Sequence, residues 1–195
     1  HYLINLKELI NQIINQKGNF DIKIIIVHQY QDLYTIKKFK KFFKKKNVLY
    51  KNINFENLSI SKNIGLKLSK SNLITFIDDD VKIKKNYFNV CYEYFKRTGC
   101  DALFSRLGSI NSNKPFLLGM RAKDTNINYF NTRSCLSTTL WIKNHSKLKI
   151  NFDENFGLGS RYGSGEETDL IFQLLQKKKK NILFSRNWNF TFTRV

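Results

Sequence analysis

Acidic residues are scarce in this chain, and six of its fifteen lie in two short clusters. The first cluster, Asp78-Asp79-Asp80, directly follows the apolar segment 72–77. Adjacent carboxylates repel one another unless a cation or positive neighbours offset their charge. Carboxylate oxygens at the end of a strand suit Mg²⁺ or Mn²⁺, which often bind one or two carboxylates together with substrate phosphates. The cluster is a candidate metal site, and the alternative is an acidic turn that only leads the chain out of a strand.

The second acidic cluster, residues 166–169, opens a predicted helix. Four of the nine glycines fall within the nine residues just before it: Gly157, Gly159, Gly163 and Gly165. So many glycines predict a loop whose backbone approaches another group closely or moves, and a carboxylate at its rim can act as a general base. The alternative is structural, because Ser164 and Glu167 have the spacing of a capping box and acidic side chains interact favourably with a helix N-terminus.

The segments that must position these clusters alternate between strand and helix patterns. Apolar residues at helical spacing predict helices near 3–14, 33–46, 60–68, 88–98 and 170–175, with Gly18 and Gly99 ending the first and fourth. Short apolar runs predict strands at 22–27, 47–51, 72–77, 181–184 and 187–192. Residues 106–135 are loop-rich, and no helix or strand is predicted there. The alternation predicts an α/β fold with a mostly parallel sheet and helices on both faces, which binds ligands beyond the carboxyl ends of its strands.

Composition limits the possible classes of protein. With 195 residues, 42% of them apolar, the chain can bury a core as one domain and is not globally disordered. Its formal charge of +19 favours polyanionic partners such as nucleotides, anionic lipid or nucleic acid. No apolar run approaches the roughly 20 residues of a membrane span. The odd number of cysteines, Cys91, Cys100 and Cys135, predicts buried reduced thiols rather than a zinc or disulfide framework.

Four blocks of this sequence resemble the motifs of a known enzyme family. LSISKNIG (58–65), NLITFIDDD (72–80), FDENFG (152–157) and GEETDL (165–170) are similar in order and spacing to the "ARNxG", "hhhhDxD", "FDExFG" and "GEDxDL" blocks of the family 2 glycosyltransferases. The resemblance covers roughly residues 20–185. It implies the GT-A, Rossmann-like fold and an enzyme that takes a sugar from a nucleotide-sugar donor, usually with inversion.

The resemblance also implies roles for the donor side of the site. Asp78 would approach the donor's ribose or the metal shell, and Asp80 would coordinate the Mn²⁺ or Mg²⁺ ion that bridges the diphosphate. Asp79 is assigned to the donor site as well. Lys62 stands where the family often has Arg and Asn63 matches its Asn, so both are expected to line the nucleotide.

On the acceptor side, Glu167 falls at the position of the catalytic base, where Asp is commoner in the family. Glu166 is assigned to the catalytic residues with Glu167, and it would shape the acceptor side together with Asp169. Gly165, Asp169 and Trp141 are expected to contact the acceptor. Gly65 lies inside a predicted helix, where glycine is less stable than alanine by about 1 kcal/mol. We therefore expect close packing at that position.

Two stretches depart from the family pattern. The family's first strand, with its "PxYN"-like nucleotide-binding end, is not seen, so we expect the chain to begin just after it. The strand at 22–27 is followed by His28-Gln29-Tyr30-Gln31 instead of "DDGS". Either His28 or Gln29 replaces that contact with the nucleotide base, or the base is recognised differently here. The alternative for His28 is an ordinary loop histidine.

These features lead to one principal hypothesis. A single GT-A domain, 1–195, would have a nucleotide-sugar half at about 1–105 and an acceptor half at about 106–195. It would be a metal-dependent, inverting enzyme of the hexosyltransferase type that moves a sugar, expected from a UDP-sugar, to a hydroxyl of a glycan or lipid-linked acceptor in bacterial surface polysaccharide synthesis.

Two alternatives remain, a catalytically inactive scaffold with the same fold and, less favoured, a nucleic-acid-binding protein. The second lacks a recognised module and has acids where phosphates would lie. The lysines at 37–46 and 177–180 are either solvated surface or an attachment to the anionic cytoplasmic face of a membrane. We therefore expect a cytoplasmic protein that can reach the inner membrane face and that does not bind nucleic acid.

Overall fold

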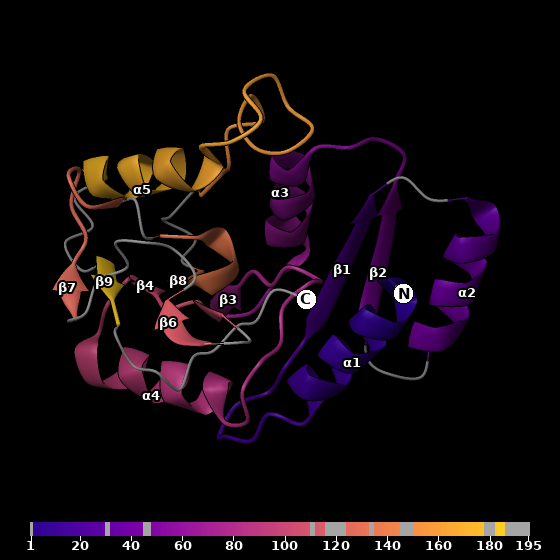
Figure 1. Cartoon of the computed structure of the whole chain (residues 1–195), viewed down its shortest axis with the longest axis horizontal. Coiled ribbons are helices and arrows are strands. Elements are labelled where there is room, and N and C mark those ends of the chain that lie inside the picture. Colours follow the sequence, from indigo (N-terminus) through magenta and orange to yellow (C-terminus); the bar gives the residue numbers. More distant parts are fainter. Residues whose placement is uncertain are drawn as a thin grey trace. The chain divides into compact units, whose positions relative to one another are not determined.

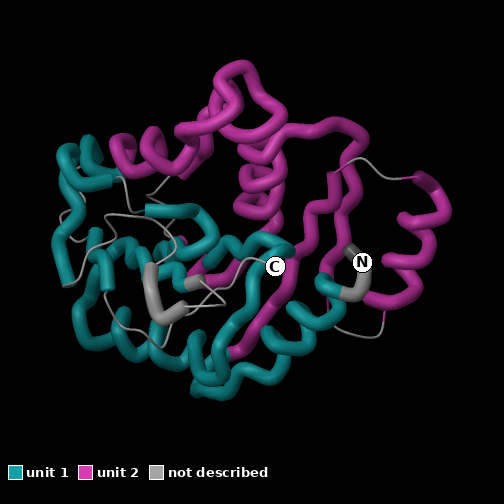
Figure 2. Tube along the Cα trace, viewed as in Figure 1, with its two compact units in different colours: residues 1–20, 75–143, 174–195 teal, residues 21–74, 144–173 magenta. Residues whose placement is uncertain are grey.

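The computed structural model describes residues 2–29, 32–44, 48–109, 112–115, 124–132, 135–144, 150–177 and 182–185. The chain forms two compact units that are interleaved along the sequence, as Figure 2 shows. Unit 1 comprises residues 1–20, 75–143 and 174–195, and unit 2 comprises residues 21–74 and 144–173. Neither unit coincides with the expected halves at 1–105 and 106–195.

Unit 2 contains a pair of parallel strands, the helices that follow each of them, and most of helix α5 (Glu166–Gln176) (Figure 1). Strands β1 (Ile24–Gln29) and β2 (Val48–Ile53) pair in parallel, from Ile24 opposite Val48 to Gln29 opposite Ile53. Helix α2 (Leu33–Phe43) connects them and packs against β2, while α3 (Leu58–Leu68) follows β2 and packs against β1. This is the crossover connection that parallel strands require, as the sequence pattern predicted.

Aromatic side chains join α2 to the strands of unit 2. The ring centroids of Phe39 and Phe43 lie 5.9 and 6.1 Å from that of Tyr50, and Phe39 lies 4.7 Å from the ring of His28. Phe39 and Phe43 are almost completely buried. Because alternate residues of a strand face the same side, His28 of β1 and Tyr50 of β2 belong to the face that α2 covers.

Unit 1 contains helices α1 (Tyr2–Ile14) and α4 (Tyr87–Thr98) and most of a five-stranded sheet with the order β3-β8-β4-β9-β7. The sheet is formed by short strands: β3 (Leu73–Thr75), β4 (Ala102–Phe104), β7 (Thr125–Asn126), β8 (Leu140–Lys143) and β9 (Ile182–Phe184). Strand β4 is parallel to β9 and antiparallel to β8, and β7 is antiparallel to β9. A separate hairpin pairs β5 (Gly108–Ser109) with β6 (Ser112–Pro115).

The strands of unit 1 therefore include antiparallel pairs that the helix–strand alternation did not predict. Helix α5 (Glu166–Gln176) lies between β4 and β9 in the chain and permits their parallel pairing. Strands β5, β6 and β7 come from the loop-rich segment 106–135, where their two to four residues are too short to show a period. The predicted strand at 187–192 and the lysines at 178–180 lie outside the described residues.

Two glutamines of the N-terminal segment hold the chain that follows the aspartates. The backbone N–H of Ile83 donates to Gln12 Oε1 at 2.7 Å. Gln16 accepts from the backbone N–H of Phe88 at 3.0 Å and donates to the carbonyl of Lys84 at 3.0 Å. Helix α1 is thus tied to residues 83–88, and it ends at Ile14, four residues earlier than the predicted stop at Gly18.

The core of unit 1 confirms several expectations. Gly99 ends α4 in the left-handed conformation, with φ of 65°. All three cysteines are buried thiols, as expected, and burial raises the pKa of the Cys91 thiol well above its ordinary value. In the described part of the chain, no helix is long and apolar enough to cross a membrane.

Candidate active site

Helix α3 and its N-cap residue hold the segment 152–156 through polar side chains. The amide nitrogen of Asn57 donates to the carbonyl of Glu154 at 3.0 Å, and the hydroxyl of Ser59 donates to the carbonyl of Phe156 at 2.6 Å. Asn63 donates to the carbonyl of Phe152 at 2.9 Å and accepts from the backbone N–H of the same residue at 2.8 Å. The sequence blocks 58–65 and 152–157, which are far apart in the chain, therefore form one substructure.

The bonds of Asn63 change its expected role. Both its amide oxygen and its amide nitrogen serve the backbone of Phe152, and the nitrogen also donates to Glu154 Oε1 at 3.3 Å. The expectation of a contact between Asn63 and the nucleotide is corrected to a clamp on residues 152–154, because these bonds occupy the amide.

Two glycines allow the backbone after this segment to approach its neighbours. Gly157 has φ of +96°, and a Cβ there would lie 3.0 Å from Ser59 Oγ and 3.3 Å from the carboxyl carbon of Glu166. Gly159 has φ of +77°, and a Cβ there would lie 2.6 Å from the carbonyl oxygen of Glu56. The expectation that these glycines permit close backbone approach is confirmed at both positions.

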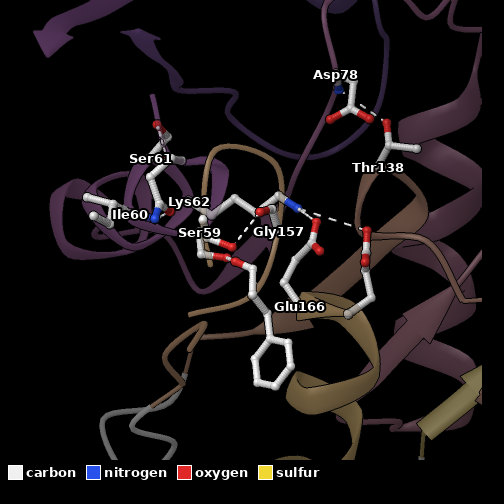
Figure 3. Close-up of polar contacts among 12 residues, drawn as sticks. Ser59, Ile60, Ser61, Lys62, Asp78, Thr138, Gly157 and Glu166 are labelled. Carbon is white, nitrogen blue, oxygen red and sulfur yellow. Dashed lines mark hydrogen bonds and ion pairs between the residues drawn. The ribbon is translucent and has the colours of Figure 1, made fainter. Parts of the chain in front are cut away.

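A buried ion pair joins α3 to the start of α5. Lys62 Nζ lies 3.1 Å from Glu166 Oε1, and both side chains are only 6% exposed (Figure 3). The same ammonium lies 4.0 Å from Glu167 Oε1 and 5.1 Å from the centroid of the Phe152 ring. Burial of an unpaired charge is strongly unfavourable, so each partner of this pair depends on the other. The predicted donor ligand Lys62 is in this structure the partner of the acidic cluster.

The first turn of α5 presents Glu167 differently from Glu166. The Glu167 side chain is 21% exposed, against 6% for Glu166, and its distance from Lys62 is longer. Asp169, which is partly exposed, accepts from the side chain of Gln173 at 2.7 Å. Of the acidic pair, Glu167 is the residue whose carboxylate is the more accessible to solvent, and hence to a substrate.

The capping-box interpretation of this helix start is wrong. Helix α5 begins at Glu166, and the carbonyl of Gly165 accepts the first helical hydrogen bond, from the backbone N–H of Asp169 at 3.0 Å. Ser164 therefore lies one residue before the N-cap position, and Glu167 is the second helical residue instead of the third. Acidic side chains in this first turn still interact favourably with the helix dipole.

The aspartate cluster belongs to unit 1 and follows β3. The hydroxyl of Thr75 donates to the carbonyl of Leu140 at 2.9 Å. The backbone N–H of Asp78 donates to Thr138 Oγ1 at 3.1 Å, as Figure 3 shows. Asp78, Asp79 and Asp80 are all partly exposed. The segment is thus anchored by two hydroxyl contacts just before the carboxylates that were predicted to bind a cation.

These carboxylates suit a metal site completed by substrate phosphates and water better than one built from protein side chains alone. Among the described residues, no three His, Cys, Asp or Glu side chains gather closely enough to hold a metal by themselves. Mg²⁺ and Mn²⁺ accept oxygen ligands and commonly take only one or two carboxylates, with substrate phosphates and water as the remaining ligands. Asp78 and Asp80 supply that chemistry.

Two predicted ligand-binding residues lie in cores. His28 is the fifth residue of β1, not a loop residue, and is 3% exposed; its Nδ1 lies 2.7 Å from the hydroxyl of Tyr50. Trp141 is 6% exposed, and its indole N–H donates to the hydroxyl of Tyr87 at 2.9 Å. The expectation that His28 reads the base and that Trp141 contacts the acceptor is corrected to a packing role for both, because their rings face protein.

Gln29 and Gly65 also depart from expectation. Gln29 Oε1 accepts from the backbone N–H of Asn57 at 2.9 Å and so supports the start of α3. A methyl group at Gly65 would meet no described atom within 4 Å. The expected close packing at Gly65 is wrong for the part of the chain that the structure describes.

Comparison with known proteins supplies the family. The model of glycosyl transferase family 2 matches residues 4–147, and no curated protein matches the chain. The structure of residues 1–349 of TarS from S. aureus is similar with a TM-score of 0.76 and 16% identity, over 100% of this chain and 57% of that one. The same TarS fragment in complex with UDP-GlcNAc gives a TM-score of 0.69 and 19% identity, over 93% of this chain and 52% of that one.

A further similar structure is GalNAc-T7 with UDP, GalNAc and Mn²⁺, which has a TM-score of 0.69 and 11% identity over 97% of this chain and 41% of that one. The chain thus spans little more than half the length of the TarS fragment. At these identities the likeness concerns the fold, which is GT-A. The family match covers most of the sequence, and the chain belongs to glycosyl transferase family 2.

Proposed function

We propose that this chain transfers a sugar from a nucleoside-diphosphate donor, most simply a UDP-sugar, to a hydroxyl of a glycan or lipid-linked acceptor, with inversion. The observation that carries the proposal is the acidic pair at the start of α5, in which Lys62 holds Glu166 and leaves Glu167 more exposed. The binding of UDP and UDP-GlcNAc by TarS supports a nucleotide-sugar donor.

Glu167 is the proposed general base. Its carboxylate takes the proton of the acceptor hydroxyl while that oxygen attacks the anomeric carbon from the side opposite the diphosphate. The new C–O bond forms as the bond between the anomeric carbon and the diphosphate breaks, and the nucleoside diphosphate leaves with the electron pair. No covalent intermediate with the protein is needed, so the anomeric configuration inverts.

Lys62 and Glu166 prepare the base for this step. Two adjacent carboxylates repel each other, and the ammonium of Lys62, 3.1 Å from one and 4.0 Å from the other, offsets that repulsion. Because Glu166 is buried in the ion pair, its proposed role is to position Lys62 beside Glu167 and not to transfer a proton. Asp169 and Gly165, on the same turn, remain the proposed acceptor contacts.

Asp78 and Asp80 are the proposed ligands of a divalent cation, and Asp79 remains assigned to the donor site. When bound, Mn²⁺ or Mg²⁺ would neutralise charge on the departing diphosphate as a Lewis acid. Because the cation needs ligands from both the protein carboxylates and the donor phosphates, we expect the cation and the donor to bind together. The anchoring of Asp78 through Thr138 supports a fixed position for the first carboxylate.

The proposal includes bacterial surface polysaccharide synthesis as the pathway and the cytoplasm as the location. The three buried cysteine thiols fit a reducing compartment. Polysaccharide acceptors are polyhydroxylated, which suits a site whose base removes a hydroxyl proton.

The first experiment screens nucleotide-sugars by thermal shift, with and without Mn²⁺, and then measures release of the nucleoside diphosphate with glycan acceptors. Specific binding stabilises the protein by about 2.7 kcal/mol at a hundredfold excess of ligand over Kd. We expect stabilisation by a UDP-sugar that depends on Mn²⁺, followed by turnover. Donor binding without turnover for any acceptor would favour the inactive scaffold. Absence of donor binding together with tight binding of nucleic acid would favour a nucleic-acid-binding protein.

The second experiment compares matched carboxylate variants. Glu167→Gln is expected to lower kcat by about 10²–10⁴ with donor affinity nearly unchanged, because the base acts on the acceptor. Glu166→Gln should lower it less, and a reversed ranking would assign the base to Glu166. Asp80→Asn should remove most of the Mn²⁺-dependent donor affinity while Asp79→Asn removes less, since Asp80 is a proposed ligand of the cation and Asp79 is not. Equal affinity in wild type and Asp80→Asn would refute the metal assignment.

A further inference from the structure

The exposed face of helix α2 carries positive charge only. At about 100° per residue, its outward side chains occupy an arc of about 160°, opposite the buried Phe39 and Phe43. Five exposed lysines share this arc: Lys37, Lys38, Lys40, Lys41 and Lys44. Among the described residues, no acidic side chain forms an ion pair with them. The nearest acid along the chain, Asp32, accepts both the backbone N–H and the hydroxyl of Thr35 as the N-cap.

Two apolar side chains extend the same face at its N-terminal end. Leu33 is 75% exposed and Tyr34 is 74% exposed, and Lys38 Nζ lies 5.9 Å from the centroid of the Tyr34 ring. Attraction to the C-terminal end of the helix dipole explains Lys40, Lys41 and Lys44, but not the two lysines at the middle of the helix. The apolar face of α2 is buried against the protein, so membrane contact would use the lysines for electrostatic attraction to anionic lipid and the two exposed apolar side chains for burial in the interface.

We propose that this face of α2 docks onto an anionic lipid bilayer. The lysines would face the anionic headgroups, and Leu33 and Tyr34 would enter the boundary with the acyl chains. Nucleic acid would satisfy the lysines equally well, but it offers no apolar region for a leucine. The face carries none of the residues of the proposed active site, so substitutions on it change the proposed docking surface without changing those residues.

The number of lysines predicts how strongly the face contributes to membrane binding. A lysine near an anionic membrane surface contributes about 1 kcal/mol, which is roughly a fivefold increase in partitioning. Removing three such lysines should therefore lower the partition coefficient by about a hundredfold or more, and added salt should lower it further. The apolar pair should supply the part of the binding that resists salt.

Co-sedimentation of the full chain with vesicles tests the proposal, using phosphatidylcholine alone and phosphatidylcholine mixed with phosphatidylglycerol. The test variant is Lys37→Glu/Lys38→Glu/Lys41→Glu. The matched control is Lys51→Glu/Lys67→Glu/Lys70→Glu, which makes the same change in net charge at exposed lysines outside α2. A third variant, Leu33→Ser/Tyr34→Ser, removes the apolar anchors, and far-UV circular dichroism checks that all three are folded.

We expect wild type and the control to bind only the phosphatidylglycerol vesicles, the α2 lysine variant to lose that binding, and the Leu33/Tyr34 variant to lose the salt-resistant part. Absence of wild-type binding, or equal loss in the control and the α2 variant, would overturn the proposal. Tighter binding to duplex DNA than to vesicles, weakened by the same α2 lysine changes, would also overturn it and assign the face to nucleic acid. Because vesicle binding is measured without donor, its failure leaves the proposed glycosyl transfer untouched.

Discussion

Lys62→Met is the perturbation that examines the buried ion pair most directly. Methionine keeps the length and the apolar stem of lysine but removes the ammonium that lies 3.1 Å from Glu166 Oε1. The carboxylate of Glu166 then stays in a site where its side chain is 6% exposed, without the ammonium that paired with it. The variant therefore tests a buried charge without its partner and changes little else in the packing.

The expected magnitude follows from that burial. Removal of one partner from a buried ion pair destabilises a protein by about 3–5 kcal/mol, because the remaining charge is left desolvated. For a chain of this size each kcal/mol lowers Tm by about 2–4 °C, so Tm should fall by roughly 6–20 °C. The double variant Lys62→Met/Glu166→Gln removes both charges and should recover part of the loss, with a coupling energy of about 0.5–3 kcal/mol.

Urea unfolding followed by tryptophan fluorescence and circular dichroism measures these free energies. Lys67→Met is the matched control, because Lys67 is an exposed lysine of the same helix. Its effect should stay within about 0.5 kcal/mol of zero. The reasoning is refuted if Lys62→Met is as stable as Lys67→Met, or if the Lys62 and Glu166 changes are simply additive.

Three further predictions concern the same framework. Asn63→Ala should lower the free energy of unfolding by about 1–3 kcal/mol in urea titration, because it removes the two-way bond to the Phe152 backbone; an unchanged midpoint would contradict the clamp. Gly65→Ala should raise stability by about 0.5–1 kcal/mol and Gly159→Ala should lower it by at least about 1–3 kcal/mol, because the first site is helical and open while the second has φ of +77° and a carbonyl 2.6 Å from the added methyl. Calorimetry that gave both changes the same sign would contradict this. Burial and, to a smaller extent, the charge of Asp124 raise the pKa of Tyr94 to about 12. Since its unfolded pKa is about 10, the contribution of Tyr94 to stability is complete below pH 10 and is lost as pH rises towards 12. Tyr94→Phe should therefore lessen the loss of stability at alkaline pH, measured by unfolding at a series of pH values.

Local patterns accounted for the elements that have enough length to show a period. The helical spacing of apolar residues predicted α1, α3, α4 and α5, and the crossover of α2 between two apolar runs predicted the parallel pair β1–β2. The order of four blocks predicted the family and the GT-A fold. These features are readable because one amphipathic face or one motif lies within a short stretch of chain.

Side-chain roles depended on contacts that a local pattern does not contain. A shift of the β1 boundary by two residues moved His28 from a predicted loop into the strand, under Phe39 of α2. Trp141 lies on β8, a strand of four residues at the end of a segment that showed no period. Their burial follows from which face of each strand meets a helix, and a one-residue change in register reverses that face.

The sequence by itself therefore determined the family, the order of its main helices and strands, and the two acidic clusters, because each of these resides in neighbouring residues. Only the tertiary structure decided that Lys62 pairs with Glu166, 104 positions away, and that Asn63 binds the backbone of Phe152 instead of a ligand. It also decided that units 1 and 2 are interleaved along the chain. An ion pair between distant residues forms where packing excludes water and brings opposite charges together, and that condition exists only once α3 meets the first turn of α5.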